Sequence, residues 1–270
     1  MKNRTVKYLS LWALSLLMAN CVKTEPLDVE KDYKQQLTER AKQEQQREDA
    51  AKAKAEAEAE RTEENKKALE AYWAQLREYK QKAWANQGEK PFIYMWWTGW
   101  RAVDGLDRSW LQSIPDTTTA ISLWGGYGKQ PADMTENEKY DLDIFHKKGS
   151  KVFLCWQVSN VGLGLPSEGK ENGFTRFRQK TADNETFRCQ IYARDLARYI
   201  IACGFDGFDI DWEPNIGNHG HGYNEFASGT SVNGYNKNMN TFIAEIGKYF
   251  GDKYSGDQRK QYLRDLFDEN

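Results

Sequence analysis

Gly204-Phe-Asp-Gly-Phe-Asp-Ile-Asp-Trp-Glu213 is the stretch of sequence that decides the fold. Asp209, Asp211 and Glu213 are spaced by two residues, which is the side-chain period of a β-strand, so we expect their carboxylates on one face. The positions between them are apolar and are expected to face a covering helix: Phe208, Ile210 and Trp212. The stretch therefore predicts a largely buried strand that presents acids on one side only.

Three carboxylates on one strand face repel one another, so at least one of their pKa values must rise. Crowded acids do not help a protein fold, but a protonated carboxyl beside an anionic one is useful in acid catalysis. The alternative interpretation is a solvated strand end or a cation site. A calcium loop needs a glycine turn and loop spacing, whereas this stretch is a hydrophobic strand.

The rest of the chain predicts more units of the same kind. Apolar runs at 92–97, 120–124 and 152–158 predict strands, and the intervening segments predict helices. Thr135 and Glu138 have the spacing of a capping box, and Gly149 is a stop signal. Alternating strands and helices indicate a parallel α/β sheet. Acids at the C-terminal end of a strand fit a sheet of the (β/α)8 TIM-barrel type, whose site lies at that face. A whole barrel needs about 250 residues, so we expect an incomplete, truncated barrel of about four units.

The N-terminal segment resembles the export signal of a bacterial lipoprotein. A basic start and an apolar run over 8–18 lead to Leu17-Met-Ala-Asn-Cys21, a lipobox-like sequence. We expect Cys21 to be lipidated and to anchor the protein to a membrane of the bacterial cell envelope; the alternative is an ordinary signal peptide that releases a soluble product. We predict a signal peptide over 1–21, a charged helical or disordered stalk over 22–67, and an amphipathic helix over 68–90 before the barrel domain of 91–270. A partner-binding or scaffold role for the stalk stays open.

Composition excludes some partners. The formal net charge is -2, which gives no basis for binding nucleic acid. The remaining cysteines are predicted to be free, buried thiols: Cys155, Cys189 and Cys203. His219 and His221 lie in a glycine-rich loop without a third ligand, so we expect exposed side chains and no metal site. No cofactor is expected.

Asp206-Gly-Phe-Asp209-Ile-Asp211-Trp-Glu213 fits the pattern Asp-x-x-Asp-x-Asp-x-Glu, so the chain resembles glycoside hydrolase family 18, the chitinases and endo-β-N-acetylglucosaminidases. In that family the motif lies on the fourth barrel strand. The resemblance implies that Glu213 is the general acid, that Asp211 orients the substrate's acetamide group, and that Asp209 shares a proton with Asp211. Asp206 is out of phase with these acids and is expected to support the strand through hydrogen bonds.

The resemblance implies a glycan or glycoprotein containing N-acetylglucosamine as the partner. The Ser-x-Gly-Gly of the family's third strand is replaced by Cys155-Trp-Gln-Val-Ser159-Asn, which favours an endo-β-N-acetylglucosaminidase over a chitinase. Tyr94-Met-Trp-Trp-Thr-Gly-Trp100 resembles the family's aromatic first strand, and Tyr94, Trp97 and Trp100 either stack on sugar rings or fill the core. The tyrosine and tryptophan of the family's later strands have no counterparts here. The alternative function is therefore an inactive remnant or a non-catalytic glycan-binding lipoprotein.

Overall fold

The computed structural model describes residues 29–59, 63–85, 90–213, 223, 225–226, 231–232 and 235–268. The chain divides into two compact units, residues 1–60 and 61–270. In the first unit, helix α2 spans Val29–Ala59. Its side chains from 34 to 51 are all exposed, as expected for a helix made almost entirely of charged residues, glutamine and alanine.

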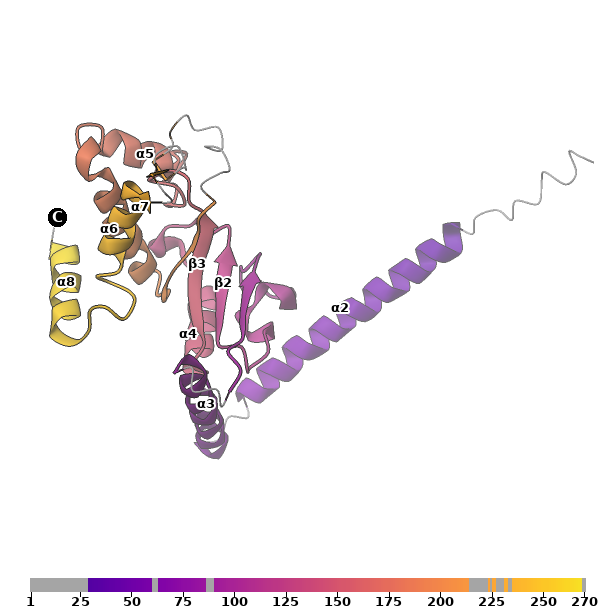
Figure 1. Cartoon of the computed structure of the whole chain (residues 1–270). Coiled ribbons are helices and arrows are strands. Elements are labelled where there is room, and N and C mark those ends of the chain that lie inside the picture. Colours follow the sequence, from indigo (N-terminus) through magenta and orange to yellow (C-terminus); the bar gives the residue numbers. More distant parts are fainter. Residues whose placement is uncertain are drawn as a thin grey trace, which may run out of the picture. The chain divides into compact units, whose positions relative to one another are not determined.

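Four parallel strands organise the second unit (Figure 1): β1 Tyr94–Trp97, β2 Ala120–Trp124, β3 Lys151–Gln157 and β4 Gly207–Asp211. They pair in the order β1-β2-β3-β4, which is also their order in the sequence. Sequential parallel pairing with helical crossovers is the arrangement found in part of a TIM barrel. The prediction of an α/β fold with four βα units is confirmed.

Helices and short turns connect the strands. The α-helices of this unit are α3 Glu63–Trp84, α4 Glu136–Lys147, α5 Gly173–Lys180, α6 Arg188–Ala202, α7 Lys237–Ile246 and α8 Gly256–Asp268. The 3-10 turns are η1 Asp107–Ser109, η2 Leu111–Ser113, η3 Pro131–Asp133 and η4 Glu185–Phe187. A small antiparallel pair consists of β5 Ser231–Val232 and β6 Tyr235–Asn236.

One face of the sheet forms the main core. Alternate residues of the four strands pack there against α4, α6 and α7, and they include Ile121, Val152 and Leu154, which are fully buried. Phe208, Ile210 and Trp212 pack against the same core. The apolar positions of the motif strand thus meet covering helices, as their spacing predicts.

Helix α4 begins and ends where the sequence indicates. The Thr135 side chain accepts a hydrogen bond from the Glu138 amide, and the Glu138 side chain accepts one from the Thr135 amide, which completes the capping box. Gly149 follows the helix with a φ of 79°, a left-handed conformation that glycine adopts without strain.

Helix α3 docks on the C-terminal end of α4. Trp73 and Leu76 form a small apolar cluster with Ile144. Arg77 donates to the Lys147 carbonyl at 2.7 Å, and the buried Lys80 ammonium donates to the Lys148 carbonyl at 2.8 Å. Because the last carbonyls of a helix lack intrahelical partners and carry partial negative charge, these two cations stabilise the end of α4.

Two helices were not expected from the sequence. Helix α5 follows a segment rich in glycine and proline, and the sequence of α8 is polar and highly charged. Leu266 of α8 is 1% exposed and packs against Ala197 and Tyr249. A small apolar cluster therefore holds this charged helix on the domain: Tyr262, Leu263 and Leu266 of α8 pack with Ala197, Ile201, Tyr249 and Phe250.

Candidate active site

Strand register places the acids of the motif on the uncovered face of the sheet. Asp209 pairs with Cys155 and Asp211 pairs with Gln157 of β3, while Cys155 pairs with Trp124 of β2. Partners in a parallel sheet point to the same side, so these side chains share one face. Asp211 is the last residue of β4 and Glu213 follows two residues later. The acids therefore lie at the C-terminal edge, where sites form in parallel α/β folds.

Asp206 lies at the opposite end of the strand and is held by hydrogen bonds. Its carboxylate accepts hydrogen bonds from His146 Nε2 at 2.8 Å, Lys151 Nζ at 2.7 Å and the Val152 amide at 2.8 Å. Burial alone would raise the pKa of Asp206, but these three donors outweigh burial and hold it below its ordinary value. The three hydrogen bonds tie the residue before β4 to α4 and to the start of β3, and the supporting role of Asp206 stays a prediction.

Asp209 is held by two hydroxyl groups from neighbouring strands. Tyr94 Oη donates to Asp209 Oδ2 at 2.6 Å, and Ser122 Oγ donates to the same oxygen at 2.7 Å. Burial and the hydrogen bond to Asp209 both raise the pKa of Tyr94, so its hydroxyl stays protonated and remains a donor. Ser122 was not predicted as a site residue, because only the pairing of β2 through β3 to β4 brings it to Asp209.

Asp211 is the acid whose pKa is raised. Partial burial is the largest cause, and the charges of Glu213 and Asp209 add to it. No side chain within the described residues donates a hydrogen bond to the Asp211 carboxylate to oppose these effects. The pKa of Asp211 therefore lies in the direction expected from crowding, with burial as the larger cause and the neighbouring carboxylates as the smaller one.

Glu213 lies furthest out and is exposed. Gln157 Nε2 donates a hydrogen bond to Glu213 Oε2. Gln157 is the last residue of β3, and it was not predicted as a site residue. An amide at this position fixes the direction of a side chain that would otherwise rotate freely in solvent.

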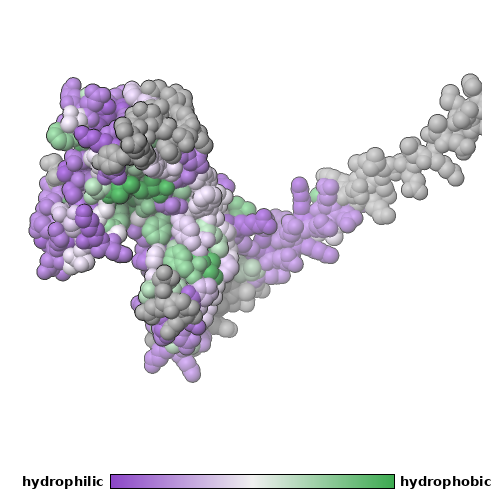
Figure 2. Space-filling view, in the orientation of Figure 1, coloured by the Kyte–Doolittle hydropathy of each residue, from purple (hydrophilic) through white to green (hydrophobic). Residues whose placement is uncertain are grey.

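The uncovered face carries exposed aromatic side chains beside the acids. A hollow of about 300 Å³ is lined by Trp84, Phe92, Tyr94, Phe153, Phe208 and Asp209. Figure 2 shows apolar surface gathered over the part of the molecule that holds the strands, whereas the surface over the helices is largely hydrophilic. Trp96 and Trp124 lie on this face as well, and they are 64% and 39% exposed.

The three aromatic residues predicted for sugar stacking are divided between the two faces. Tyr94 lies on the acid face and contacts Asp209 directly. Trp97 packs against the main core, and Trp100 is 6% exposed with its indole nitrogen 2.8 Å from Asp141 Oδ2. The alternative interpretation, in which these residues fill the core, therefore fits Trp97 and Trp100.

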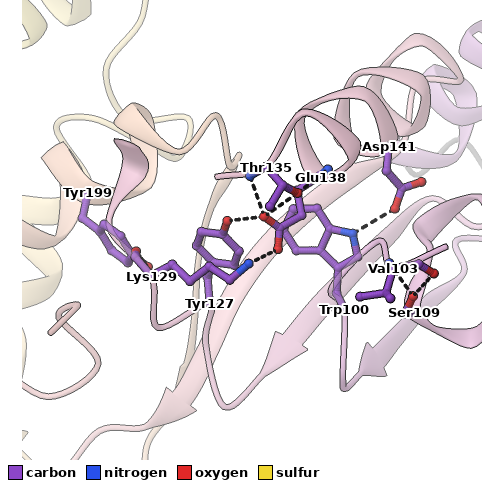
Figure 3. Close-up of polar contacts among 9 residues, drawn as sticks. All are labelled: Trp100, Val103, Ser109, Tyr127, Lys129, Thr135, Glu138, Asp141 and Tyr199. Carbon is purple, nitrogen blue, oxygen red and sulfur yellow. Dashed lines mark hydrogen bonds and ion pairs between the residues drawn. The ribbon is translucent and has the colours of Figure 1, made fainter. Parts of the chain in front are cut away.

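Two buried carboxylates of α4 hold the loops that follow β1 and β2 (Figure 3). In the segment after β1, Trp100 donates a hydrogen bond to Asp141. The Leu111 amide donates a second one, at 2.6 Å. Glu138 accepts hydrogen bonds from Tyr127 at 2.9 Å and from Lys129, after β2. Burial would raise the pKa of Glu138, but the bonds from Lys129, Thr135 and Tyr127 hold it below its ordinary value. Helix α4 thus holds the segments that follow the C-terminal ends of β1 and β2.

The predictions for the cysteines, for the histidine loop and for Cys21 have different outcomes. Cys155, Cys189 and Cys203 are free and buried, as predicted, and burial raises the pKa of each thiol to about 12. Within the described ranges, no group of three or more His, Cys, Asp or Glu side chains is arranged so that it could hold a metal ion, and no helix has the length and apolar character to cross a bilayer. Cys21, His219 and His221 lie outside the described residues.

The comparisons with known proteins agree with this geometry. The model of glycoside hydrolase family 18, BT1044-like, matches residues 49–260. A solved structure of BT1044, a selenomethionine-labelled variant, is similar with a TM-score of 0.51 and 27% sequence identity over 67% of this chain. The match spans 52% of the BT1044 chain, about half its length. A search among curated proteins found no significant match. The chain belongs to glycoside hydrolase family 18 and to its BT1044-like group.

Proposed function

We propose that the protein hydrolyses β-1,4-linked N-acetylglucosamine glycans, as an endo-β-N-acetylglucosaminidase does, by substrate-assisted retaining catalysis. The observation that carries the proposal is the placement of Asp209, Asp211 and Glu213 on one face at the C-terminal edge of the sheet, in a chain of family 18. Family 18 enzymes use the substrate's acetamide oxygen in place of a protein nucleophile.

In the proposed first step, the protonated Glu213 carboxyl gives its proton to the glycosidic oxygen as the bond from that oxygen to C1 breaks. The acetamide carbonyl oxygen bonds to C1 and forms a cyclic oxazolinium ion, whose N–H donates to Asp211. Water then attacks C1, and Glu213 takes a proton from that water. The bond from the acetamide oxygen to C1 breaks, which restores the acetamide group, and C1 keeps its original configuration. Asp209, which accepts hydrogen bonds from Tyr94 and Ser122, shares a proton with Asp211 in this proposal.

A second function is glycan binding without turnover. Glu213 is exposed, whereas the general acid of a glycosidase ordinarily lies in a partly enclosed site. The uncovered aromatic face would suit a binding protein equally well.

The test uses the full chain with a high-mannose glycoprotein and with chitin oligomers, comparing the wild type with Glu213→Gln. We expect the variant to lose about 100- to 10,000-fold in turnover, the usual contribution of a general acid. An exposed acid away from the site, Glu136→Gln, is the matched control and should keep full activity. Binding of either glycan without measurable turnover by the wild type would establish the second function.

We also propose that the protein is a lipoprotein of the bacterial cell envelope, tethered through Cys21. Metabolic labelling with a fatty acid in the native host should mark the wild type, and Cys21→Ser should abolish the label. An unlabelled wild type recovered from the medium would favour the ordinary signal peptide, and a Cys21→Ser variant that is still labelled would place the acyl chain on another residue.

A further inference from the structure

Two tryptophans on the acid face have no role in the core. Trp96 is the most exposed of the large hydrophobic side chains that the structure describes, at 64%, and Trp124 is 39% exposed. Their rings lie together, with centroids 5.2 Å apart and planes tilted by 33°. By contrast, Trp73, Trp110 and Trp156 are 9% exposed or less. An exposed pair of tryptophans at the edge of a candidate site is typical of a ligand-binding surface.

The backbone beneath this pair is rigid. Trp96 lies within β1 and Trp124 ends β2, so both are fixed by the parallel ladder. The segments that follow them are held by the buried carboxylates Asp141 and Glu138 of α4 (Figure 3). A preformed aromatic surface binds with little loss of side-chain entropy.

Register sets the distance from the pair to the acids. Trp124, Cys155 and Asp209 form one row across β2, β3 and β4. Two strand spacings separate Trp124 from Asp209, or roughly 10 Å. A disaccharide can bridge this separation, so one ligand could contact both the tryptophans and the acids.

We propose that Trp96 and Trp124 form a stacking platform for a pyranose ring of the glycan, and that the glycan runs across the sheet from β4 toward β1. The face of an indole ring carries partial negative charge, and it attracts the C–H groups that cover one face of a pyranose. The tilt between the rings offers two aromatic planes to successive sugars. This inference rests on the proposed function, because it takes the glycan of that function as the occupant.

The experiment measures binding in the Glu213→Gln background, where turnover cannot consume the ligand. The probes are chitobiose and chitotetraose, followed by calorimetry, with the full chain. We expect Trp96→Ala and Trp124→Ala each to weaken chitotetraose binding by about tenfold or more, as for buried tryptophan anchors in other interfaces. Trp124→Phe should recover part of the affinity, since it restores an aromatic face.

Phe187→Ala is the matched control, because Phe187 is 58% exposed but lies on η4, away from the acid face. It should leave chitotetraose affinity unchanged, and melting curves show whether each variant is folded. Unchanged affinity in folded Trp96→Ala and Trp124→Ala overturns the platform, as does a change in oligomeric state without a change in affinity. If glycan binding needs both tryptophans but the wild type shows no turnover, the platform stands and the hydrolase proposal fails.

Discussion

Asp206 and Asp211 belong to one motif and lie at the two ends of β4, Asp206 directly before its first residue, yet their surroundings act on them in opposite ways. Asp206, at the start of β4, accepts three hydrogen bonds and has a lowered pKa. Asp211, at the end of β4, has a raised pKa because partial burial and the charges of Glu213 and Asp209 disfavour its ionised form. The first acid is placed to stabilise the fold, and the second stores unfavourable electrostatic energy at the candidate site.

The comparison teaches that a sequence motif can combine two physical tasks. Residue Asp206 is fixed where β4 enters the sheet, next to Val152 and Lys151 of β3. Its hydrogen bonds to β3 hold the register of β4 along β3, and this register sets the positions of Asp211 and Glu213 at the C-terminal edge of the sheet. The variants below separate the two tasks.

The largest expected effect concerns catalysis by Asp211. Asp211→Asn removes the charge that would stabilise the oxazolinium ion, so we expect turnover of a susceptible glycan to fall by about 100- to 1,000-fold. Initial rates on the glycoprotein substrate measure the change. A loss of less than about threefold, within assay scatter on this scale, would remove Asp211 from the mechanism.

The next effect concerns stability at Asp206. Asp206→Asn leaves the Lys151 ammonium without its counter-charge, so we expect the free energy of unfolding to fall by about 1–3 kcal/mol. Because the folded pKa is lowered, this stabilisation is present above the unfolded value of 3.8 and is lost as pH falls through the folded pKa. Denaturant titrations of both proteins at neutral and at acidic pH measure the difference.

Asp183→Asn is the control for this prediction, since Asp183 is exposed on the turn after α5. The control should match the wild type in stability at every pH. A difference between wild type and Asp206→Asn that persists at the most acidic pH would mean that the charge of Asp206 is not its source.

A smaller effect is expected from the hydroxyl of Tyr94. Tyr94→Phe removes one of the two hydroxyl donors to Asp209 but leaves Ser122 in place. We expect turnover to fall by about tenfold, equivalent to one hydrogen bond to a charged group. Tyr72→Phe provides the control, because Tyr72 donates to Asp116 at 2.7 Å, away from the acid face. Equal losses in the two variants would point to a general effect on folding.

The smallest expected effect is on stability at Asp211, where replacing the acid by asparagine should stabilise the protein, whereas the same replacement at Asp206 should destabilise it. Asp211→Asn relieves repulsion at neutral pH, so we expect the melting temperature to rise by roughly 1–3 °C. A raised folded pKa means that the ionised carboxyl is disfavoured in the fold, so the wild type loses stability as pH rises from 3.8 through the folded pKa. The gap between variant and wild type should therefore close at acidic pH. Thermal melts across this pH range measure the difference. A variant less stable than the wild type at neutral pH would refute the claim that the ionised Asp211 carboxylate destabilises the fold.

The fold could be predicted from local signals where these were strong. The apolar run of β2 and the capping box of α4 fixed both elements closely, because strand pattern and helix capping act over a few residues. Helix α8 was missed because its sequence is dominated by charge, and its position depends on a few contacts with α6. Long-range packing of this kind leaves little trace in a local pattern.

In the candidate site, too, local patterns could be predicted from the sequence and long-range contacts could not. The two-residue period was enough to predict that Asp209 and Asp211 share a face. Ser122, Gln157, Trp96 and Trp124 could not be assigned, because their proximity to the acids depends on the register of strands far apart in the sequence. Trp97 and Trp100 looked equally suitable for sugar stacking, but they follow Trp96 on the chain and turn toward the core.

The packing of α3 against the C-terminal end of α4 has a practical consequence for protein production. A fragment that starts at residue 90 would lack Lys80, Trp73 and Leu76, and would leave Ile144 and the carbonyls of Lys147 and Lys148 facing water. Arg61 begins the compact unit that contains the sheet. Recombinant work on the catalytic question should therefore keep the chain from Arg61 onward, so that poor yield is not mistaken for an inactive enzyme.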